Sequence, residues 1–256
     1  MKLFHISDIH FGREDENALA QVETQFRLHK PAALVVSGDV SQRGKRSEFR
    51  AARRWLDKFN APRIVVPGNH DTPLLHLPAR IVAPFDRFDE YFLKFRDALS
   101  LSGTYISGLN TARGWQARRN WAEGSVNLED LDAEISRVED QTSTLNFLTC
   151  HHPFEPHPDA PLQTRTSRGS RASEALAKSR FGFLLVGHVH KPSVNKVVHG
   201  ECSYISLCAG TLSNRLRDMK PSFNLIEITE DHVDARAILI GPGQQTSVMK
   251  LGRWAR

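Results

Sequence analysis

Five short groups of aspartate, asparagine and histidine each follow a run of apolar residues. In two of them, Asp8-Ile9-His10 and His188-Val189-His190, two polar side chains stand two positions apart. That spacing in an extended segment places both side chains on one face. The other groups are Gly38-Asp39, Pro67-Gly68-Asn69-His70-Asp71 and Cys150-His151-His152-Pro153. A ligand set of imidazole, carboxylate and amide oxygen suits manganese, iron or zinc better than calcium or magnesium.

The apolar runs before these groups are predicted to be buried strands. Residues 2–7, 32–37 and 63–67 are rich in Val, Ile and Leu, and segments of helical period separate them at 14–29 and 45–59. This alternation indicates a largely parallel sheet. Because ligands bind at the carboxyl ends of parallel strands, we expect the polar groups to meet at one edge.

The second half of the chain adds helices and more sheet. We expect helices at 86–99 and 128–139, strands at 145–150 and 181–186, and mainly strands from 193 to 239. Two stretches have a loose composition, 152–171 and the residues from 241 onward, and we expect the second to be disordered. The predicted organisation is one domain over 1–240 with a basic tail at 241–256.

Composition limits the classes of function. The hydrophobic fraction is 40% and the charged fraction 25%, as in ordinary globular proteins. No apolar run approaches about 20 residues, and the first residues do not resemble a signal peptide, so we expect a cytoplasmic protein. The net charge of +5 favours anionic ligands. No lysine-rich block predicts a dedicated nucleic-acid surface, so nucleic acid is a less favoured partner.

Each polar group alone has an ordinary structural explanation. Asp8 could cap a helix, Gly38-Asp39 could be a turn, and paired histidines are common on surfaces. Five such groups at five strand ends are harder to explain, because packing requires no ionisable side chains there. Together they predict a metal site.

The order and spacing of these groups resemble the calcineurin-like metallophosphoesterases. The motifs D-x-H, G-D-x4-G, G-N-H-D, H and G-H-x-H run in that order from Asp8 to His190, with Gly44 completing the second. The resemblance implies an α/β fold of four layers, an αββα sandwich in which two mixed β-sheets pack face to face with helices outside. It also implies two divalent transition-metal ions. One would be held by Asp8, His10, Asp39 and His190, and the other by Asp39, Asn69, His151 and His188.

The resemblance further places His70 uncoordinated beside the substrate, with His152 in a supporting or core position. Two divalent cations against two carboxylates and a bridging hydroxide leave about one positive charge, which attracts a phosphodiester monoanion. The hydroxide would attack phosphorus in line. We expect His70 to protonate the leaving oxygen and Asp71 to hold the imidazolium, and these are the two catalytic candidates.

The flanking residues SDIHFG, GDVSQRG and HHPF look most like the bacterial cyclic-AMP phosphodiesterase group. The expected substrate is therefore a cyclic nucleotide or another small anionic phosphodiester. Phe154 departs from that group, which commonly has a second proline there, and the loop that follows is unusually basic. Substrate-binding candidates are Arg13, Arg43, Asn110 and His157, with Arg113, Arg165, Arg168 and Arg171 as further basic residues near the motifs.

Three alternatives stay open within this pattern. A nucleotide-lipid pyrophosphate hydrolase would need an apolar patch near the metals, for which Phe85, Phe88, Tyr91 and Phe92 are candidates, although their helical spacing is typical of core. A nuclease would usually carry a capping domain. A non-catalytic scaffold is disfavoured because no ligand position is missing. The tail with Trp254 could also pack across a homodimer or lie on an anionic membrane.

Overall fold

The computed structural model describes residues 1–74, 76–115, 120, 122–157 and 165–256. Its first sheet has six strands in the order β12-β11-β10-β1-β2-β3. The last three of these are parallel to one another, and the others pair antiparallel. The strands are β1 (Lys2–Ile6), β2 (Ala33–Ser37), β3 (Arg63–Val66), β10 (Ser222–Ile228), β11 (His232–Ile240) and β12 (Thr246–Ala255).

The second sheet also has six strands, in the order β4-β5-β6-β7-β9-β8. Its four inner strands are parallel and its two edge strands antiparallel. The strands are β4 (Leu99–Leu101), β5 (Thr104–Gly108), β6 (Leu145–Thr149), β7 (Phe183–Val186), β8 (Ser193–His199) and β9 (Cys202–Cys208).

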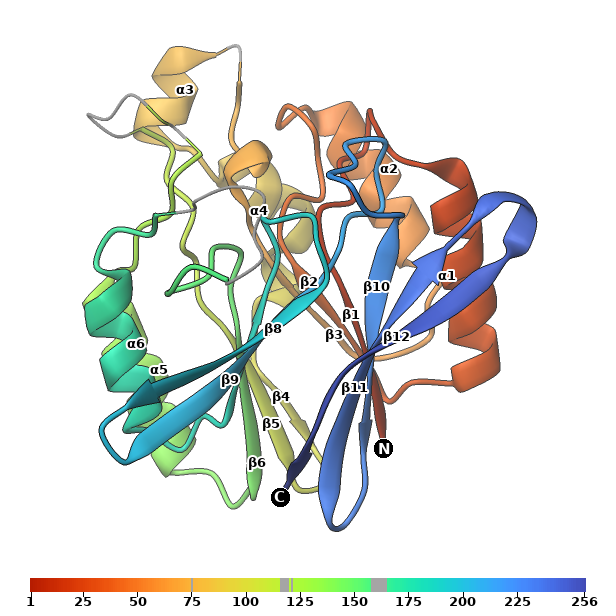
Figure 1. The fold of residues 1–256 in the computed structure, drawn as a ribbon. Coiled ribbons are helices and arrows are strands. Elements are labelled where there is room, and N and C mark those ends of the chain that lie inside the picture. Colours follow the sequence, from red (N-terminus) through yellow and green to blue (C-terminus); the bar gives the residue numbers. More distant parts are fainter. Residues whose placement is uncertain (75, 116–119, 121, 158–164) are drawn as a thin grey trace.

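The two sheets pack face to face, and helices cover both outer faces (Figure 1). The central core includes Leu3, Ile64, Phe147 and Leu185, contributed by both sheets. Outside the first sheet lie α1 (Glu16–His29), α2 (Arg46–Leu56) and α4 (Asp86–Phe92), and outside the second lie α5 (Leu128–Glu139) and α6 (Gly169–Ala177). The predicted four-layer architecture is confirmed.

This layering explains the apolar runs in the sequence. Every residue of β2 and of β7 is buried. Strands buried on both faces read as continuous apolar runs, because neither face meets water. The N-terminal alternation of strand and helix is confirmed within a few residues, and α5 lies at the predicted positions.

The region after α4 differs from the prediction of one helix over 86–99. The α-helix ends at Phe92, a 3₁₀ turn follows at Leu93–Phe95, and Leu99–Leu101 pairs with β5 as a strand. Phe88 and Phe92 are buried in the helix-covered core, whereas Leu93 is 60% exposed. The α-helix therefore ends seven residues, about two turns, before the predicted end. A short helix, α3 (Leu77–Val82), was not predicted.

The expectation of a disordered tail is wrong. Residues Thr246–Ala255 form β12, which pairs with β11 along its length as the edge of the first sheet. The Trp254 ring meets Phe183 of the second sheet edge-on, with centroids 5.6 Å apart. The loose stretch at 152–171 also contains the start of α6, and residues 158–164 of it lie outside the described residues. Among the helices described, none has the length and apolar character to cross a membrane.

Candidate metal centre

The five polar groups meet where the two sheets converge. Each follows a parallel strand, namely β1, β2, β3, β6 or β7. Hydrogen bonds join the groups across the sheets: His151 Nδ1 donates to the Ser37 carbonyl at 2.8 Å, and the His188 amide donates to Asp8 Oδ2 at 2.9 Å. The predicted convergence at one edge is confirmed.

The backbone at this edge is strained in a specific way. Five ligand candidates have left-handed backbone, with φ between 50° and 69°: Asp8, His10, Asp39, His188 and His190. For residues with a Cβ this region costs roughly 1–2 kcal/mol each. Such strain concentrates at functional sites, where it directs side chains that a regular strand would point elsewhere.

Two motif glycines allow the groups to approach one another. A Cβ on Gly68 would lie 2.1 Å from Asp39 Oδ1, and one on Gly187 would lie 2.6 Å from Asp8 Oδ2. Any side chain at either position would therefore displace a buried carboxylate. The motif glycines are explained by this contact.

Asp8, His10 and His190 form one half of the cluster. His10 Nε2 lies 3.2 Å from His190 Nε2 and 3.7 Å from both Asp8 Oδ1 and Asp39 Oδ2. His190 Nδ1 donates to the Arg215 carbonyl at 2.8 Å, so its Nε2 faces the cluster. All of these side chains are buried.

Asp39, Asn69 and His151 form the other half, with His188 beside them. His151 Nε2 lies 3.3 Å from Asp39 Oδ2 and 3.2 Å from Asn69 Oδ1. The His188 and His151 rings are 5.2 Å apart. Asp39 is within 4 Å of both His10 and His151, which places its carboxylate between the two halves.

The electrostatics fit cation binding. Burial opposes ionisation of Asp8 and Asp39, but neighbouring histidines outweigh it. His190 and His151 hold the pKa of Asp8 below its ordinary value. His151 and His70 do the same for the pKa of Asp39. Burial lowers the pKa of His10 and of His188 to about 3, so both imidazoles are neutral at pH 7 and have a lone pair to offer a cation. Against burial, Asp39 and Asp8 raise the pKa of His151 to about 9, so a cation there must displace a proton.

The donor set also fits metal ions. Asp8 Oδ1 and His10 Nδ1 are buried polar atoms without a hydrogen-bond partner in the described part of the chain. Potential ligand atoms of Asp8, His10 and His190 lie within 4.8 Å of one another, as do those of Asp8, Asp39 and His151. Buried, overlapping groups of oxygen and imidazole nitrogen ligands are suited to two adjacent transition-metal ions.

The comparisons with known proteins agree with this geometry. The sequence model of the calcineurin-like phosphoesterases matches residues 1–192. The chain belongs to the calcineurin-like phosphoesterase family. It is 40% identical over 205 residues to a glycerophosphodiester phosphodiesterase of Enterobacter lignolyticus, covering 74% of this chain and 71% of the relative.

More distant relatives are consistent with that assignment. A probable cyclic nucleotide phosphodiesterase of Synechococcus is 28% identical over 165 residues, covering 60% of this chain and 58% of the relative. A dimetal phosphatase structure from Danio rerio superposes with a TM-score of 0.67 at 12% identity, covering 98% of this chain and 99% of the other. This last similarity shows that the fold is shared.

In this phosphoesterase, the two catalytic candidates occupy different environments. His70 lines a pocket that opens over the cluster. Its Nδ1 donates to the Gln42 carbonyl at 2.8 Å, and its Nε2 accepts from Arg215 Nη1 at 2.8 Å. The Asp71 carboxylate instead accepts hydrogen bonds from the Val40, Ser41 and Gly68 amides and from the Ser41 hydroxyl. The expected contact of Asp71 with the His70 imidazole is therefore wrong, because Asp71 organises the turn.

A pocket of about 290 Å³ opens over this centre. Its lining includes ligand candidates Asp39, Asn69, His188 and His190, and also His70. The described lining residues outside the motifs are Asn120, Ala122, Glu123, Arg165, Arg215 and Arg217. The His152 ring packs beside the centre, with its centroid 4.5 Å from that of His188, and both of its ring nitrogens are engaged by Thr111 Oγ1 and the Ala122 carbonyl at 3.0 Å. This is the supporting position expected for it.

The four substrate-binding candidates are absent from the described lining of this pocket. Arg13 and Arg43 are exposed on turns. Asn110 lines a separate pocket, and its side-chain oxygen accepts from the Ala112 amide. His157 is buried with both ring nitrogens bonded to serine hydroxyls. Sequence reasoning missed Arg215 and Arg217, which follow β9 outside the recognised motifs.

The buried position of His157 predicts a pH-dependent contribution to stability. Burial lowers its pKa from 6.5 to about 4. The unfolded chain therefore gains a proton below pH 6.5 that the folded chain resists until about pH 4, so this contribution is lost as the pH falls through that window. In His157→Gln, the unfolding free energy should depend less on pH there, by up to about 1.4 kcal/mol per pH unit. Urea unfolding between pH 7 and 4.5 measures this.

The same variant separates structure from substrate binding. Because His157 does not line the pocket, kcat/KM for bis-p-nitrophenyl phosphate at pH 7.5 should stay within about threefold of wild type. A loss of tenfold or more with an unchanged stability profile would restore His157 as a substrate-binding residue.

Proposed function

We propose that this chain is a two-metal phosphodiesterase that hydrolyses small phosphodiesters. The observation that carries the proposal is the convergence of seven buried or pocket-lining ligand candidates beneath a single cationic pocket. Asp8, His10, Asp39 and His190 would hold one metal ion. Asp39, Asn69, His151 and His188 would hold the second.

The chain's own residues prepare this centre for an anionic substrate. Divalent cations bound there would supply Lewis acidity for the phosphate oxygens and a nucleophilic water at neutral pH. Asn69 offers an amide oxygen, which adds a ligand without adding negative charge. With only Asp8 and Asp39 as carboxylate ligands, the centre keeps a net positive charge when loaded, which favours a phosphodiester monoanion.

His70 is proposed to move a proton at Nε2. Its Nδ1–H is already directed to the Gln42 carbonyl, so the ring orientation is set. In the structure Nε2 faces Arg215. If a bound substrate draws the Arg215 guanidinium toward an anionic oxygen, His70 Nε2 is free to take up a proton from water. The resulting imidazolium could then transfer that proton to the leaving oxygen.

The relatives suggest two substrates to compare. The Enterobacter relative is named for glycerophosphodiesters and the Synechococcus relative for cyclic nucleotides, and both substrates are small phosphodiesters. The residues that flank the metal-ligand motifs favour cyclic AMP as the substrate. The higher sequence identity to the Enterobacter relative favours a glycerophosphodiester. A lipid pyrophosphate is less consistent with the structure, because Phe88 and Phe92 are buried in the helix-covered core.

Metal dependence and substrate choice can be measured together. Protein stripped by a chelator should lose hydrolysis of bis-p-nitrophenyl phosphate and regain it with manganese. Asp39→Asn should lose at least about a hundredfold in kcat, because the shared ligand is weakened. Asp140→Asn, an exposed acid after α5, is the control and should retain activity.

The same assays with 3′,5′-cyclic AMP and glycerophosphocholine identify the natural substrate class. Turnover of cyclic AMP supports a cyclic nucleotide phosphodiesterase, and turnover of glycerophosphocholine alone supports a glycerophosphodiesterase. Full activity of thoroughly metal-stripped protein would contradict the proposal.

Replacement of His70 tests its role as proton donor. His70→Ala should bind metal as wild type does but lose about a hundred- to ten-thousandfold in kcat for glycerophosphocholine, whose leaving alcohol needs a proton. The loss should be much smaller for bis-p-nitrophenyl phosphate, because p-nitrophenolate leaves without protonation. Equal losses on both substrates would remove the assignment.

A further inference from the structure

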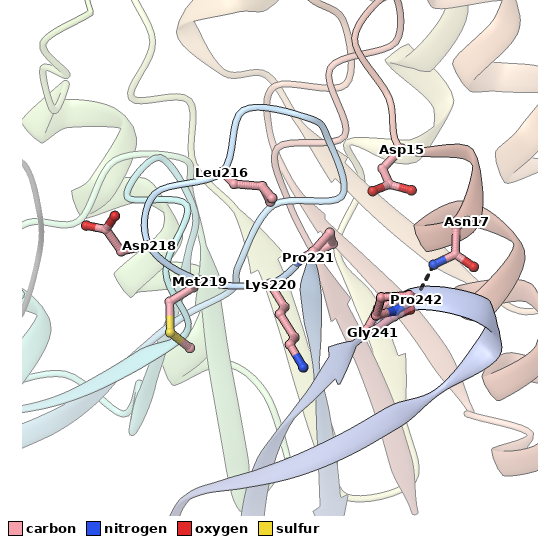
Figure 2. Close-up of a pocket in the computed structure, with 10 residues that line it drawn as sticks. Asp15, Asn17, Leu216, Asp218, Met219, Lys220, Pro221, Gly241 and Pro242 are labelled. Carbon is pink, nitrogen blue, oxygen red and sulfur yellow. Dashed lines mark hydrogen bonds between the residues drawn. The ribbon is translucent and has the colours of Figure 1, made fainter.

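The loop between β9 and β10 divides two pockets. Arg215 and Arg217 line the pocket over the candidate metal centre. Leu216 and Asp218 line a separate pocket of about 500 Å³. Figure 2 shows them among the residues that line it. The two arginines thus line the pocket over the centre, while the intervening Leu216 and the following Asp218 line the other pocket.

Hydrogen bonds to the ligand-bearing turns hold this loop in place. The Thr211 hydroxyl donates to the Asp8 carbonyl at 2.7 Å, and the Asn214 amide donates to the Arg13 carbonyl at 2.9 Å. The Arg215 carbonyl accepts from His190 Nδ1 at 2.8 Å. The loop that carries both arginines is therefore attached to the same turns that carry the ligand candidates, so the backbone positions of the two arginines are fixed relative to those turns.

No carboxylate of the described residues lies within ion-pair distance of either arginine. In the part of the chain that the structure describes, neither forms an ion pair, and the side-chain partner of Arg215 is the imidazole of His70. Burial, and then the charge of Arg215, lower the pKa of Arg217, while the carboxylate of Asp8 opposes this shift. By contrast, Arg53 and Arg63 each contact Asp57.

Two adjacent guanidinium groups exceed what one phosphodiester monoanion needs. The scissile phosphate would already lie against the positively charged metal centre. A guanidinium matches a carboxylate or phosphate with paired hydrogen bonds. Glu123 and Arg165 also line the pocket, so the described lining carries three arginines against Glu123 and the ligand candidate Asp39.

We propose that Arg215 and Arg217 bind a second anionic group of the substrate, so that the preferred substrates are phosphodiesters in which one ester arm carries its own negative charge. This inference rests on the proposed phosphodiesterase function. In this proposal the two arginines determine substrate specificity. Replacing Arg217 tests the proposal more directly than replacing Arg215, because Arg215 also contacts His70.

A matched pair of synthetic esters isolates the charge. One is 4-carboxyphenyl p-nitrophenyl phosphate and the other is its 4-carbamoylphenyl analogue, which has nearly the same size and a neutral arm. Both release p-nitrophenolate. The manganese-loaded wild-type protein should cleave the carboxylate ester with a kcat/KM at least about tenfold higher, and the ratio should fall as salt screens the charges.

The variants assign the preference to the loop. Arg217→Met should bring the ratio close to one, Arg217→Lys should keep part of it, and the double variant with Arg215→Met should abolish it. Arg50→Met, which removes an exposed arginine of α2, is the control and should keep the wild-type ratio. Thermal unfolding verifies that each variant is folded.

The outcomes distinguish this inference from the proposed function. If wild-type protein cleaves bis-p-nitrophenyl phosphate with manganese but cleaves both matched esters equally, the inference fails and the phosphodiesterase function stands. A ratio that survives in the folded double variant also overturns the assignment to these arginines. If manganese restores cleavage of none of the three esters, the proposed function itself fails.

Discussion

The structure depends on two buried carboxylates that have no lysine or arginine partner among the described residues. Asp8 and Asp39 lie at the ends of neighbouring parallel strands, and their contacts within 4 Å are histidines. Burying an ionised carboxylate is costly unless a positive charge compensates it. In this chain the surrounding imidazoles supply that compensation only in part, since His10 and His188 are neutral at pH 7. Metal ions bound there would provide the remainder, which would tie the stability of this edge to its chemistry.

The fold provides the means to hold such an unfavourable arrangement. Strands β1 and β2 and strands β6 and β7, from different sheets, are buried and end at the same place. Immediately beyond them the backbone enters left-handed conformations at five of the ligand positions. This strain is tolerated because the layered cores on both sides fix the strand ends, and cross-sheet hydrogen bonds such as that from His188 to Asp8 fix the turns.

Much of this arrangement could be predicted from the sequence, and the exceptions have physical reasons. The ligand groups were visible because their residue types and spacing are local. The buried strands followed from apolar runs that lack alternation, whereas the four layers were implied by the resemblance to the calcineurin-like metallophosphoesterases. Asp71 was misassigned because adjacency in sequence does not reveal that its carboxylate turns back to the Val40 and Ser41 amides. Arg215 reaches the pocket through a long-range return of the chain, and β12 is recognisable only from its pairing with β11. His157 looked like an exposed loop residue because the serines that bury it come from β8 and β9.

The central claim is that Asp39 lies between two metal ions. It is tested most directly by anomalous scattering from crystals grown with manganese. The account predicts two anomalous peaks about 3.5–4 Å apart, one near His10 and His190 and the other near Asn69, His151 and His188, with the Asp39 carboxylate contacting both. A single peak, or peaks that do not contact Asp39, would contradict it.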